Sequence, residues 1–517
     1  MIKEEEPMKK ALSLFIAVLM LLALIPGAVA EEAPVTLTLF YQSTRPINEF
    51  TELTHQYIID ELGIDINLIQ GGDNWKQQLA LYMTSGDIPD LMAFMDAATF
   101  QGYAAEGAFY DITDRVYDYE NIIAYLNSVV GYTADDMLAR TTLDGAIYGI
   151  PSVTIARSYY SENIRTDWLE KLGLEVPTTL DEFTEVMRAF TKNDPDGNGV
   201  DDTYGFSGAQ TYYSLTPFFG AFGARPDQAY FLSEDGEKVV TNVISDDYKA
   251  ALAYIRDIYA EGLIDPEVFT ATYQQTQEKV VRGEFGYWCG WWSAAGNVVS
   301  RFGYTESNSE DSLTVIDPPV GPDGRSGVIA QDPCESYMGI GYNTEHIDEV
   351  LKLIDWAMST DGHRTVMWGV EGQFWTQDEN GVIDWNYSVG GKDKLGNEVS
   401  DMQVYRFFYD IAVENSARAL DDSFASKLYR KSIEIYSDIE VINDLFLGLS
   451  SDEYVSYYSD LDTYVKDSGI KFITGESDLD ADWDNYVSTY LSMGGEAMRT
   501  SLLNAYNDLQ GTSLSFE

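Results

Sequence analysis

Three short runs of β-forming residues, separated by helix-forming stretches, constrain the fold of this chain most strongly. The first run, Val35 to Leu39, alternates apolar residues with threonine, which is the period-two pattern of a half-buried strand. The segments that follow are a helix from about Pro46 to Leu62, a strand at Ile64 to Ile69, a helix at Trp75 to Met83 and a strand at Asp90 to Met95. Strands of this length that alternate with helices predict right-handed βαβ units and a mostly parallel sheet.

The carboxyl ends of these three strands predict where a ligand binds. In open parallel sheets, ligands lie beyond the carboxyl ends of the strands. Tyr41, Gly71 to Trp75 and Asp96 follow the three runs directly. We therefore expect these residues at the edge of a binding site.

The rest of the chain reads as further α/β structure that ends in helices. Thr179 and Glu182 form a capping box, and the apolar residues that follow recur at helical spacing. A second helix is predicted from Ser245 to Glu261 and ends before Gly262. Because no low-complexity linker separates the units, we expect lobes joined by crossing strands.

The composition indicates a folded, strongly acidic chain. Its 517 residues carry a net charge of −53, and 10 Trp, 36 Tyr and 23 Phe provide more apolar area than disordered chains have. The length allows about two to four domains. The charge argues against a nucleic-acid partner and against an anionic membrane surface, because both require a basic face.

The N-terminus predicts export. Lys9 and Lys10 precede an apolar run from Ala11 to Ile25, and Ala28-Val29-Ala30 gives a cleavage site. This is the pattern of a secretory signal peptide, residues 1–30, and the run is shorter than the roughly 20 residues of a transmembrane anchor. No cysteine follows the cleavage site. We expect an exported protein, periplasmic or extracellular and not lipid-anchored.

The chain has two cysteines, Cys289 and Cys334. Export permits a disulfide, and two buried free thiols are the alternative. A cysteine zinc site and a CxxC redox motif are excluded by the number of cysteines.

The most specific motif runs from Asp194 to Asp202 and resembles the calcium loop of an EF-hand. Its oxygen donors fall at positions 1, 3, 5, 7 and 9, and Gly199 at position 6 allows the sharp turn. The predicted ligands are Asp194, Asp196, Asn198, the carbonyl of Val200, and Asp202. Position 12 is Gly205, so the bidentate glutamate of a regulatory site is missing. We interpret the ion as a structural Ca²⁺; an unmetallated turn is the alternative.

Aromatic residues indicate a sugar site. Gly286 to Trp292 contains Trp288, Trp291 and Trp292 beside two glycines, and Trp rings stack on the apolar faces of pyranose sugars. Trp375 and Tyr159 are further candidates. Strand residues alternate between faces, so Trp288 should point away from Trp291. The alternative for each of these rings is packing in the core.

No catalytic motif accompanies the aromatic residues. The chain has three histidines, His55, His346 and His363, and lacks the nucleophile-elbow, zincin, P-loop and dinucleotide-binding motifs. We therefore predict no enzyme activity. Carboxylate pairs among the 85 acidic residues keep an exported glycoside hydrolase or lyase as the alternative. A calcium-stabilised adhesin module is a third class.

Several segments together resemble a known family. They are Trp75 to Leu91, Tyr148 to Pro151, Val176 to Phe183, Tyr259 to Asp265, Gly369 to Gly372, Lys471 to Glu476 and Trp483 to Tyr486. In this order and spacing they resemble the extracellular solute-binding proteins of ATP-driven sugar importers, in particular the long oligosaccharide-binding branch that includes alginate-binding proteins. Thr203 stands where alginate-binding relatives have an acidic calcium ligand.

This resemblance implies a periplasmic-binding-protein type II fold, with two α/β lobes around a central ligand cleft joined by hinge strands. The N-terminal lobe would comprise residues 31–156 and about 336–395, and the C-terminal lobe, with the calcium loop, residues 157–335 and about 396–517. The protein would be a monomer that closes on an oligosaccharide, which the acidic charge suggests is neutral, and passes it to the membrane permease of an ABC importer.

The site residues that we predict fall into two groups. Tyr159, Trp288, Trp291, Trp292 and Trp375 would stack on the sugar rings, and Tyr41, Trp75 and Asp96 would line the opposite wall.

Overall fold

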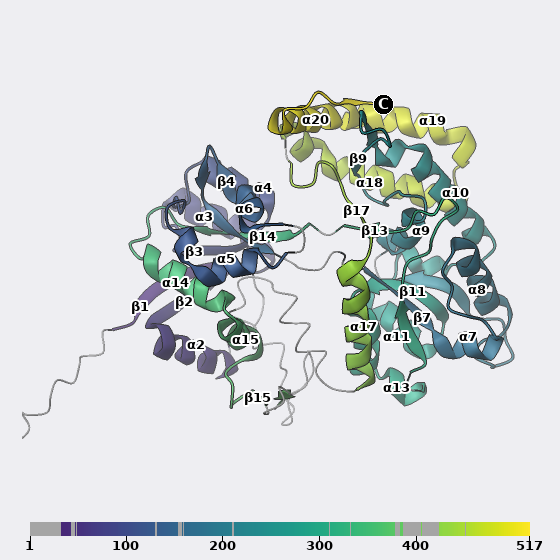
Figure 1. Ribbon diagram of the computed structural model, residues 1–517, viewed down its shortest axis with the longest axis horizontal. Coiled ribbons are helices and arrows are strands. Elements are labelled where there is room, and N and C mark those ends of the chain that lie inside the picture. Colours follow the sequence, from purple (N-terminus) through teal and green to yellow (C-terminus); the bar gives the residue numbers. More distant parts are fainter. Residues whose placement is uncertain are drawn as a thin grey trace, which may run out of the picture.

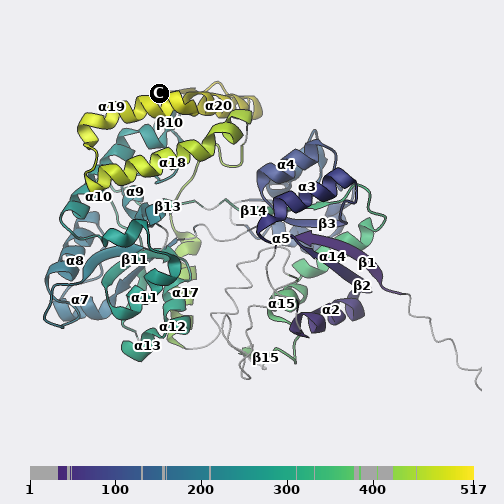
Figure 2. The same ribbon diagram turned by 180° about the vertical axis from the view of Figure 1, so that it is seen from behind.

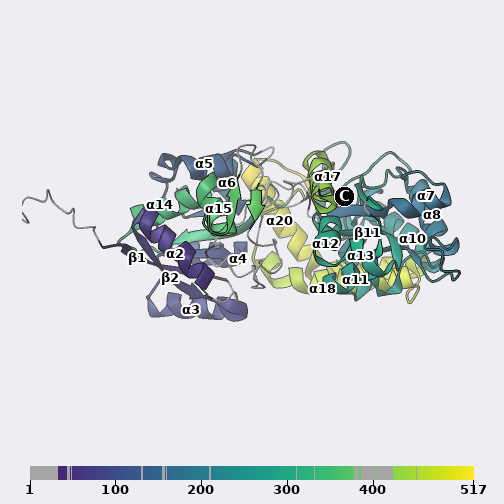
Figure 3. The same cartoon turned by 90° about the horizontal axis from the view of Figure 1, so that it is seen from below.

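The structure is a computed structural model in which two α/β units lie side by side along the long axis (Figures 1 and 3). It describes residues 33–42, 47, 49–129, 132–153, 158, 160–208, 211–309, 311–330, 332–377, 383–385, 405, 423–449 and 451–517. The predicted signal peptide and Tyr159 lie outside these residues.

The first unit is built on a five-stranded sheet in the order β2-β1-β3-β14-β6. Its strands are β1 (Val35–Tyr41), β2 (Ile64–Gln70), β3 (Leu91–Met95), β6 (Gly149–Val153) and β14 (Cys334–Ile340). β1 pairs in parallel with both β2 and β3, which confirms the predicted βαβ units. β14 enters from far along the sequence and pairs antiparallel with β3 and β6.

Helices cover this sheet and complete one apolar core. They are α2 (Glu49–Leu62), α3 (Trp75–Ser85), α4 (Ala97–Ala105), α5 (Glu120–Leu126), α6 (Ala134–Leu138), α14 (Ile347–Met358) and α15 (Thr360–Trp368). Two short strand pairs add to this unit, β4 (Thr142–Leu143) with β5 (Ala146–Ile147) and β15 (Trp375–Gln377) with β16 (Ile383–Trp385). The core contains residues of the five strands, of these helices and of β5 and β15, and also Tyr405.

The second unit is built on a four-stranded sheet in the order β12-β7-β11-β8. Its strands are β7 (Tyr160–Arg165), β8 (Tyr204–Gly208), β11 (Phe285–Trp291) and β12 (Leu313–Ile316). β11 is parallel to β8 and antiparallel to β7. Small sheets join β9 (Tyr230–Leu232), β10 (Lys238–Thr241) and β18 (Ser515–Phe516), and β13 (Val328–Ile329) with β17 (Val441–Ile442).

Helices pack on both sides of the second sheet, and three long helices near the C-terminus form a layer at one end of the unit (Figure 2). The three are α18 (Asp452–Thr474), α19 (Leu479–Tyr490) and α20 (Glu496–Gln510). The others are α7 (Thr166–Leu172), α8 (Leu180–Lys192), α9 (Thr216–Gly220), α10 (Asp246–Ala260), α11 (Tyr273–Arg282), α12 (Ala294–Arg301), α13 (Tyr304–Ser307) and α17 (Phe424–Asp438).

The two helices predicted from caps and periodicity are confirmed. Thr179 and Glu182 form the capping box of α8, and the predicted apolar stripe of that helix is buried. Ser245 caps α10, and the chain turns at Gly262 with φ of 80°.

The chain passes between the two units more than once. It leaves the first sheet after Val153 and begins the second at Tyr160, and it returns between Ile329 and Cys334. Tyr405 packs in the first core, whereas Phe424 packs in the second unit. The boundary predicted near residue 395 lies outside the described residues.

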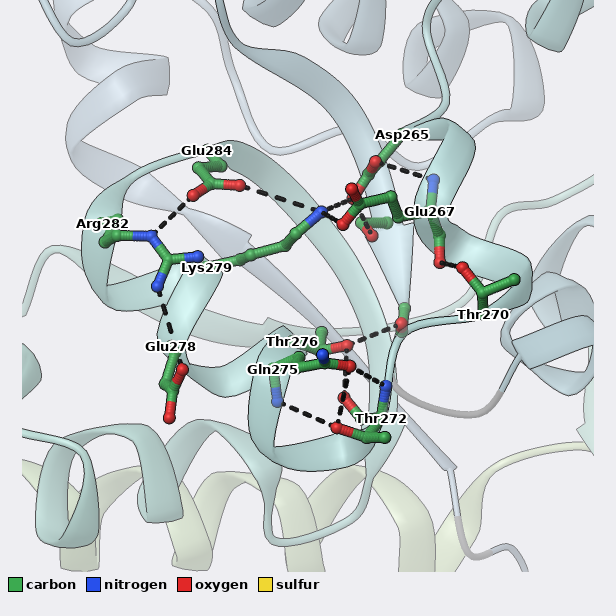
Figure 4. Close-up of polar contacts among 12 residues, drawn as sticks. Asp265, Glu267, Thr270, Thr272, Gln275, Thr276, Glu278, Lys279, Arg282 and Glu284 are labelled. Carbon is green, nitrogen blue, oxygen red and sulfur yellow. Dashed lines mark hydrogen bonds and ion pairs between the residues drawn. The ribbon is translucent and has the colours of Figure 1, made fainter.

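A buried lysine fastens α11 to the loop that precedes it (Figure 4). The ammonium of Lys279 lies 2.8 Å from Asp265 Oδ2 and 2.7 Å from Glu267 Oε2. Ser207 Oγ of β8 donates to the same Asp265 oxygen at 3.0 Å. Burial alone would lower the pKa of Lys279, but the hydrogen bonds to the two carboxylates raise it above its ordinary value. This cluster ties the helix, the loop and the sheet together.

The two cysteines are buried free thiols that belong to different cores. Cys334 Sγ contacts Met137 Sδ at 3.8 Å. In the described part of the chain, no helix has the length and apolar character needed to cross a bilayer.

Candidate ligand-binding site

The carboxyl-terminal edge of the second sheet carries a pair of stacked rings. Trp291, the last residue of β11, lies directly across from Tyr160, the first residue of β7. Their ring centroids are 5.8 Å apart and their planes differ by 14°. Both side chains are half-buried. Because β11 and β8 are parallel, this edge is where ligands of such sheets bind.

The carboxylate of Asp227 acts on the electrostatics of Tyr160 and is held in place by Arg225. Arg225 Nε and Nη2 donate to the two carboxylate oxygens of Asp227 at 2.8 and 2.6 Å. Arg225 is buried and also donates from Nη1 to the carbonyl of Ile442 at 2.9 Å. This bidentate pairing fixes the orientation of Asp227. Asp227 and Arg225 both act on the pKa of Tyr160, which burial raises above its ordinary value.

A second ion pair, Lys466 with Asp462, lies against the ring of Tyr213. Lys466 Nζ is 2.7 Å from Asp462 Oδ2 and 4.5 Å from the ring centroid of Tyr213. Burial raises the pKa of Tyr213, and the charges of Asp462 and Asp227 raise it further. The phenol therefore keeps its proton at neutral pH.

Two tyrosines on α18 complete the group. Tyr454 and Tyr458 are one helical turn apart, with ring centroids 4.8 Å apart. Burial, and then Asp444 and Asp227, raise the pKa of Tyr454 to about 12. Below, "aromatic–carboxylate cluster" means these seven residues: Tyr160, Tyr213, Asp227, Trp291, Tyr454, Tyr458 and Asp462.

A buried carboxyl group lies on the strand that carries Tyr160. Glu162 is fully buried beside Cys289 on β11, and Tyr287 donates to its Oε2 at 2.7 Å. Burial raises the pKa of Glu162 to about 8, although the hydrogen bond from Tyr287 lowers it. At neutral pH the carboxyl group is therefore mainly protonated.

This pKa predicts a pH dependence of stability. Between the ordinary pKa of 4.5 and about 8, the folded chain keeps a proton that the unfolded chain loses. The free energy of unfolding should therefore fall as the pH rises through this window, by up to ~1.4 kcal/mol per pH unit from this group. Glu162→Gln should remove that contribution. Urea unfolding at pH 5, 6.5 and 8 measures it, with Glu261→Gln as the control. Equal pH slopes for wild type and Glu162→Gln would contradict the assignment.

The predicted tryptophans of the second unit occupy three different environments. Trp288 is fully buried on the opposite face of β11 from Tyr287, as the alternation of strand residues predicts, and packs in a core with Phe285. Trp292 is 9% exposed and packs against Tyr429 of α17. Of the three, only Trp291 reaches the cluster.

The candidates of the first unit gather at the carboxyl edge of its sheet. Tyr41 is buried, with its ring centroid 5.8 Å from that of Phe94, whose backbone takes a φ of 60°. Trp75 is 7% exposed and begins α3. Asp96 caps α4, and its Oδ2 lies 2.6 Å from Lys76 Nζ. Burial raises the pKa of Asp96, but Lys76 and the Thr99 amide bring it below its ordinary value.

Trp375 lies in the first core, away from that edge. It is 3% exposed, its ring meets Trp368 edge-on with centroids 5.4 Å apart, and its Nε1 donates to Gly369 O at 2.9 Å. The Trp375 indole is therefore both buried and hydrogen-bonded within the first unit.

The predicted calcium loop has the expected turn. Asp194 Oδ1 accepts from Gly197 N at 2.9 Å, and Asn198 Nδ2 donates to Asp196 Oδ2 at 2.9 Å and to Asp202 Oδ1 at 3.1 Å. Burial raises the pKa of Asp196, and the nearby charges of Asp202 and Asp194 raise it further. Clustered carboxylates of this kind fit a hard divalent cation in donor chemistry.

The positions after Asp202 provide no further ligand. Thr203 Oγ1 donates to Phe190 O at 2.7 Å, so this hydroxyl faces the core. At Gly205, position 12, an added Cβ would lie 2.5 Å from Met187 Cβ. Within the described residues, no set of three His, Cys, Asp or Glu side chains is arranged for a metal. The oxygen ligands of the loop are of the kind that a hard cation binds. In this structure the side-chain amide of Asn198 donates to the carboxylates of Asp196 and Asp202.

The comparison with protein families decides the classification. The sequence profile of the bacterial extracellular solute-binding proteins matches residues 49–364, more than half of the chain. The chain belongs to this family. Among curated relatives, it is 26% identical over 453 residues to lipoprotein LipO of Bacillus subtilis, covering 84% of both chains. It is 24% identical over 471 residues to the fructooligosaccharide ABC transporter substrate-binding protein FusA of Streptococcus pneumoniae, covering 84% of this chain and 79% of FusA.

Solved structures of such proteins share the fold. The structure of FusA in complex with kestose matches with a TM-score of 0.68 and 21% identity, over 92% of this chain and 99% of FusA. The alginate-binding protein AlgQ2 without calcium ion matches with a TM-score of 0.66 and 21% identity, over 92% of this chain and 98% of AlgQ2. The predicted type II fold of this solute-binding protein is confirmed.

Sequence reasoning missed most of the aromatic–carboxylate cluster. Two local signals pointed to it: Arg225 and Asp227 at i, i+2, and Asp462 and Lys466 at i, i+4. Each pair is separated from the stacked rings by many residues, so its place became visible only in the folded chain.

Proposed function

We propose that this solute-binding protein is the exported substrate-binding component of an ABC importer and binds a neutral oligosaccharide between its two lobes. The observation that carries the proposal is the stacked pair of Trp291 and Tyr160, which lies beside fixed carboxylates at the carboxyl edge of the second sheet. Flat rings bind the apolar faces of sugars, and carboxylates accept hydrogen bonds from sugar hydroxyls.

The charge pairing supports a neutral ligand. Arg225 is satisfied by Asp227, and Lys466 by Asp462. At the edge of the first sheet, Lys76 is paired with Asp96. Since these cations already have carboxylate partners, a uronate would add a negative charge that none of them is free to neutralise. FusA in complex with kestose is a relative with a sugar ligand, and we place this chain with sugar binders of that kind.

Binding would shift the lobes toward a closed state. A sugar that contacts both lobes favours closure only by its greater affinity for that state. The cluster would bind one face of the sugar. The opposite wall would come from Tyr41, Trp75 and Asp96, with Tyr159 as a further candidate. The closed monomer would then deliver the sugar to the membrane permease.

We propose binding without turnover. Asp227 and Asp462 are each held by a cation, and Glu162, which keeps its proton, is fully buried. Glycoside hydrolysis needs a pair of carboxyl groups that reach the sugar. Incubation with kestose and with oligoalginate, followed by chromatography, tests this. Both sugars should be recovered intact, with heat of binding in calorimetry only for the neutral sugar. Cleavage of either sugar would identify the chain as the alternative, an exported hydrolase or lyase.

We further propose a structural Ca²⁺ at the loop from Asp194 to Asp202. The ligands would be Asp194, Asp196, Asn198, the carbonyl of Val200, and Asp202. The ion would supply the positive charge that the clustered carboxylates require, and so fix the segment between α8 and β8. The structural relative AlgQ2 has been solved without calcium ion, and we take calcium to be the cation that such a loop holds.

Chelation tests the calcium site. Removing Ca²⁺ should lower the melting temperature by about 3 °C or more, because an ion at 100 times its Kd adds about 2.7 kcal/mol. Asp196→Ala should abolish the difference between chelated and calcium-loaded protein. Asp235→Ala, in an exposed turn outside the loop, is the control. Identical melting of the wild type with and without chelator would exclude the site.

We propose that the chain is exported by cleavage after Ala30 and works without a lipid anchor. The N-terminal lobe would hold residues 31–156 and the segment from about 336 past Tyr405, and the C-terminal lobe the rest.

A further inference from the structure

One arginine of the first unit reaches the second unit near the point where the chain passes between them. Arg140 lies in a short 3₁₀ turn, Ala139–Thr141, directly after α6. Met137 and Leu138 of α6 belong to the first core, which fixes the base of this side chain. The side chain is 19% exposed.

The guanidinium of Arg140 lies on the backbone of Gly448, which belongs to the second unit. A Cβ added at Gly448 would coincide with Arg140 Nη1 and approach its Cζ at 2.6 Å. Gly448 has a φ of 80°. A side chain at this position would therefore displace the guanidinium from Gly448.

The turn that carries Gly448 is anchored in the second unit. Asp444 Oδ1 accepts hydrogen bonds from Tyr230 N at 2.9 Å and from Phe446 N at 3.2 Å. Phe446 and Tyr230 are buried together in the largest apolar core of the second unit, with ring centroids 4.7 Å apart. The turn thus presents Gly448 on a rigid support.

Arg140 also meets the segment that crosses between the units. Asp332 precedes β14, and its Oδ2 lies 3.9 Å from Arg140 Nη1. Asp332 Oδ1 accepts from Cys334 N at 2.9 Å, which fixes the carboxylate at the start of the strand. One side chain therefore contacts the first unit, the crossing segment and the second unit.

We infer that the contact of Arg140 with Gly448 is a pivot that limits the angle between the two lobes. A guanidinium that contacts both lobes and the connection between them restricts their relative rotation, because a change in the angle must move it off Gly448. Only the consequence for sugar affinity rests on the proposed function. The restriction itself is a property of the ligand-free chain.

Inter-lobe distances in the ligand-free protein test the pivot. Leu81 of α3 and Leu509 of α20 are 71% and 67% exposed and belong to different units. Both native thiols are buried, so spin labels at Leu81→Cys and Leu509→Cys report the distance between the lobes. Arg140→Ala and Gly448→Ala should each broaden the distance distribution relative to the otherwise unchanged labelled protein. The double variant should be no broader than Arg140→Ala alone, since both changes remove one contact.

Two further variants isolate the cause. Gly475 has a φ of 77°, but nothing lies within 4 Å of an added Cβ, so Gly475→Ala carries the same backbone cost and should leave the distribution unchanged. Arg140→Lys keeps the charge near Asp332 and loses the planar group over Gly448, so it should broaden the distribution as Arg140→Ala does. Unchanged distributions in Arg140→Ala and Gly448→Ala, or additive broadening in the double variant, would overturn the pivot. Failure of the labelled parent protein to bind sugar, with the distances of the variants behaving as predicted, would concern the proposed function alone.

Discussion

Replacing Lys279 with Met should lower the free energy of unfolding by about 3–5 kcal/mol, because it leaves a buried carboxylate without its cation. Asp265 is 2% exposed, and its Oδ2 lies 2.8 Å from the lysine ammonium (Figure 4). Methionine matches the length of the lysine stem and supplies no charge. Urea unfolding measured by circular dichroism gives the change.

Two controls make this result specific. Lys76→Met removes an ion pair of similar length whose side chains are 61% and 42% exposed, and it should cost about 1 kcal/mol or less. Asp265→Asn combined with Lys279→Met removes both charges and should restore part of the loss. If Lys279→Met costs no more than Lys76→Met, the cluster does not fasten α11 to the sheet.

Replacing Trp291 with Ala should weaken sugar binding about 30-fold or more, since an aromatic anchor of this kind contributes about 2 kcal/mol or more. The indole ring stacks on Tyr160 and is half-buried, so its loss removes the flat surface on which a sugar ring would lie. Calorimetry with the oligosaccharide that stabilises the protein most gives the ratio of Kd values.

The matched control is Trp356→Ala. Trp356 is also half-buried but lies on α14, where it packs against the first core. This variant should lower the melting temperature and leave the Kd unchanged. An unchanged Kd in Trp291→Ala would move the sugar site away from the second sheet.

The elements that sequence could predict were those with local causes. The capping box at Thr179 and the apolar stripe of α8 lie within one helix, so their pattern is complete in the sequence. The alternation of β1, β2 and β3 with helices likewise predicted parallel pairing. The same alternation placed Trp288 and Trp291 on opposite faces of β11.

The face of β11 that is open to a ligand is determined by segments far along the sequence. Trp288 is buried because residues of α17, well over a hundred positions later, join the same core. Tyr458 comes near Tyr213 and Asp227 only because α18 folds back onto the second unit. The packing of Tyr405 in the first core was not predictable for the same reason, since a single buried ring gives no periodic signal.

The central claim is that this protein binds neutral oligosaccharides, and a thermal-shift screen of residues 31–517 with calcium present tests it most directly. A sugar at 100 times its Kd should add about 2.7 kcal/mol, which raises the melting temperature measurably. The account predicts a rise with a neutral oligosaccharide such as kestose and none with oligoalginate. A rise with the acidic sugar alone, or no rise with any sugar, would contradict it.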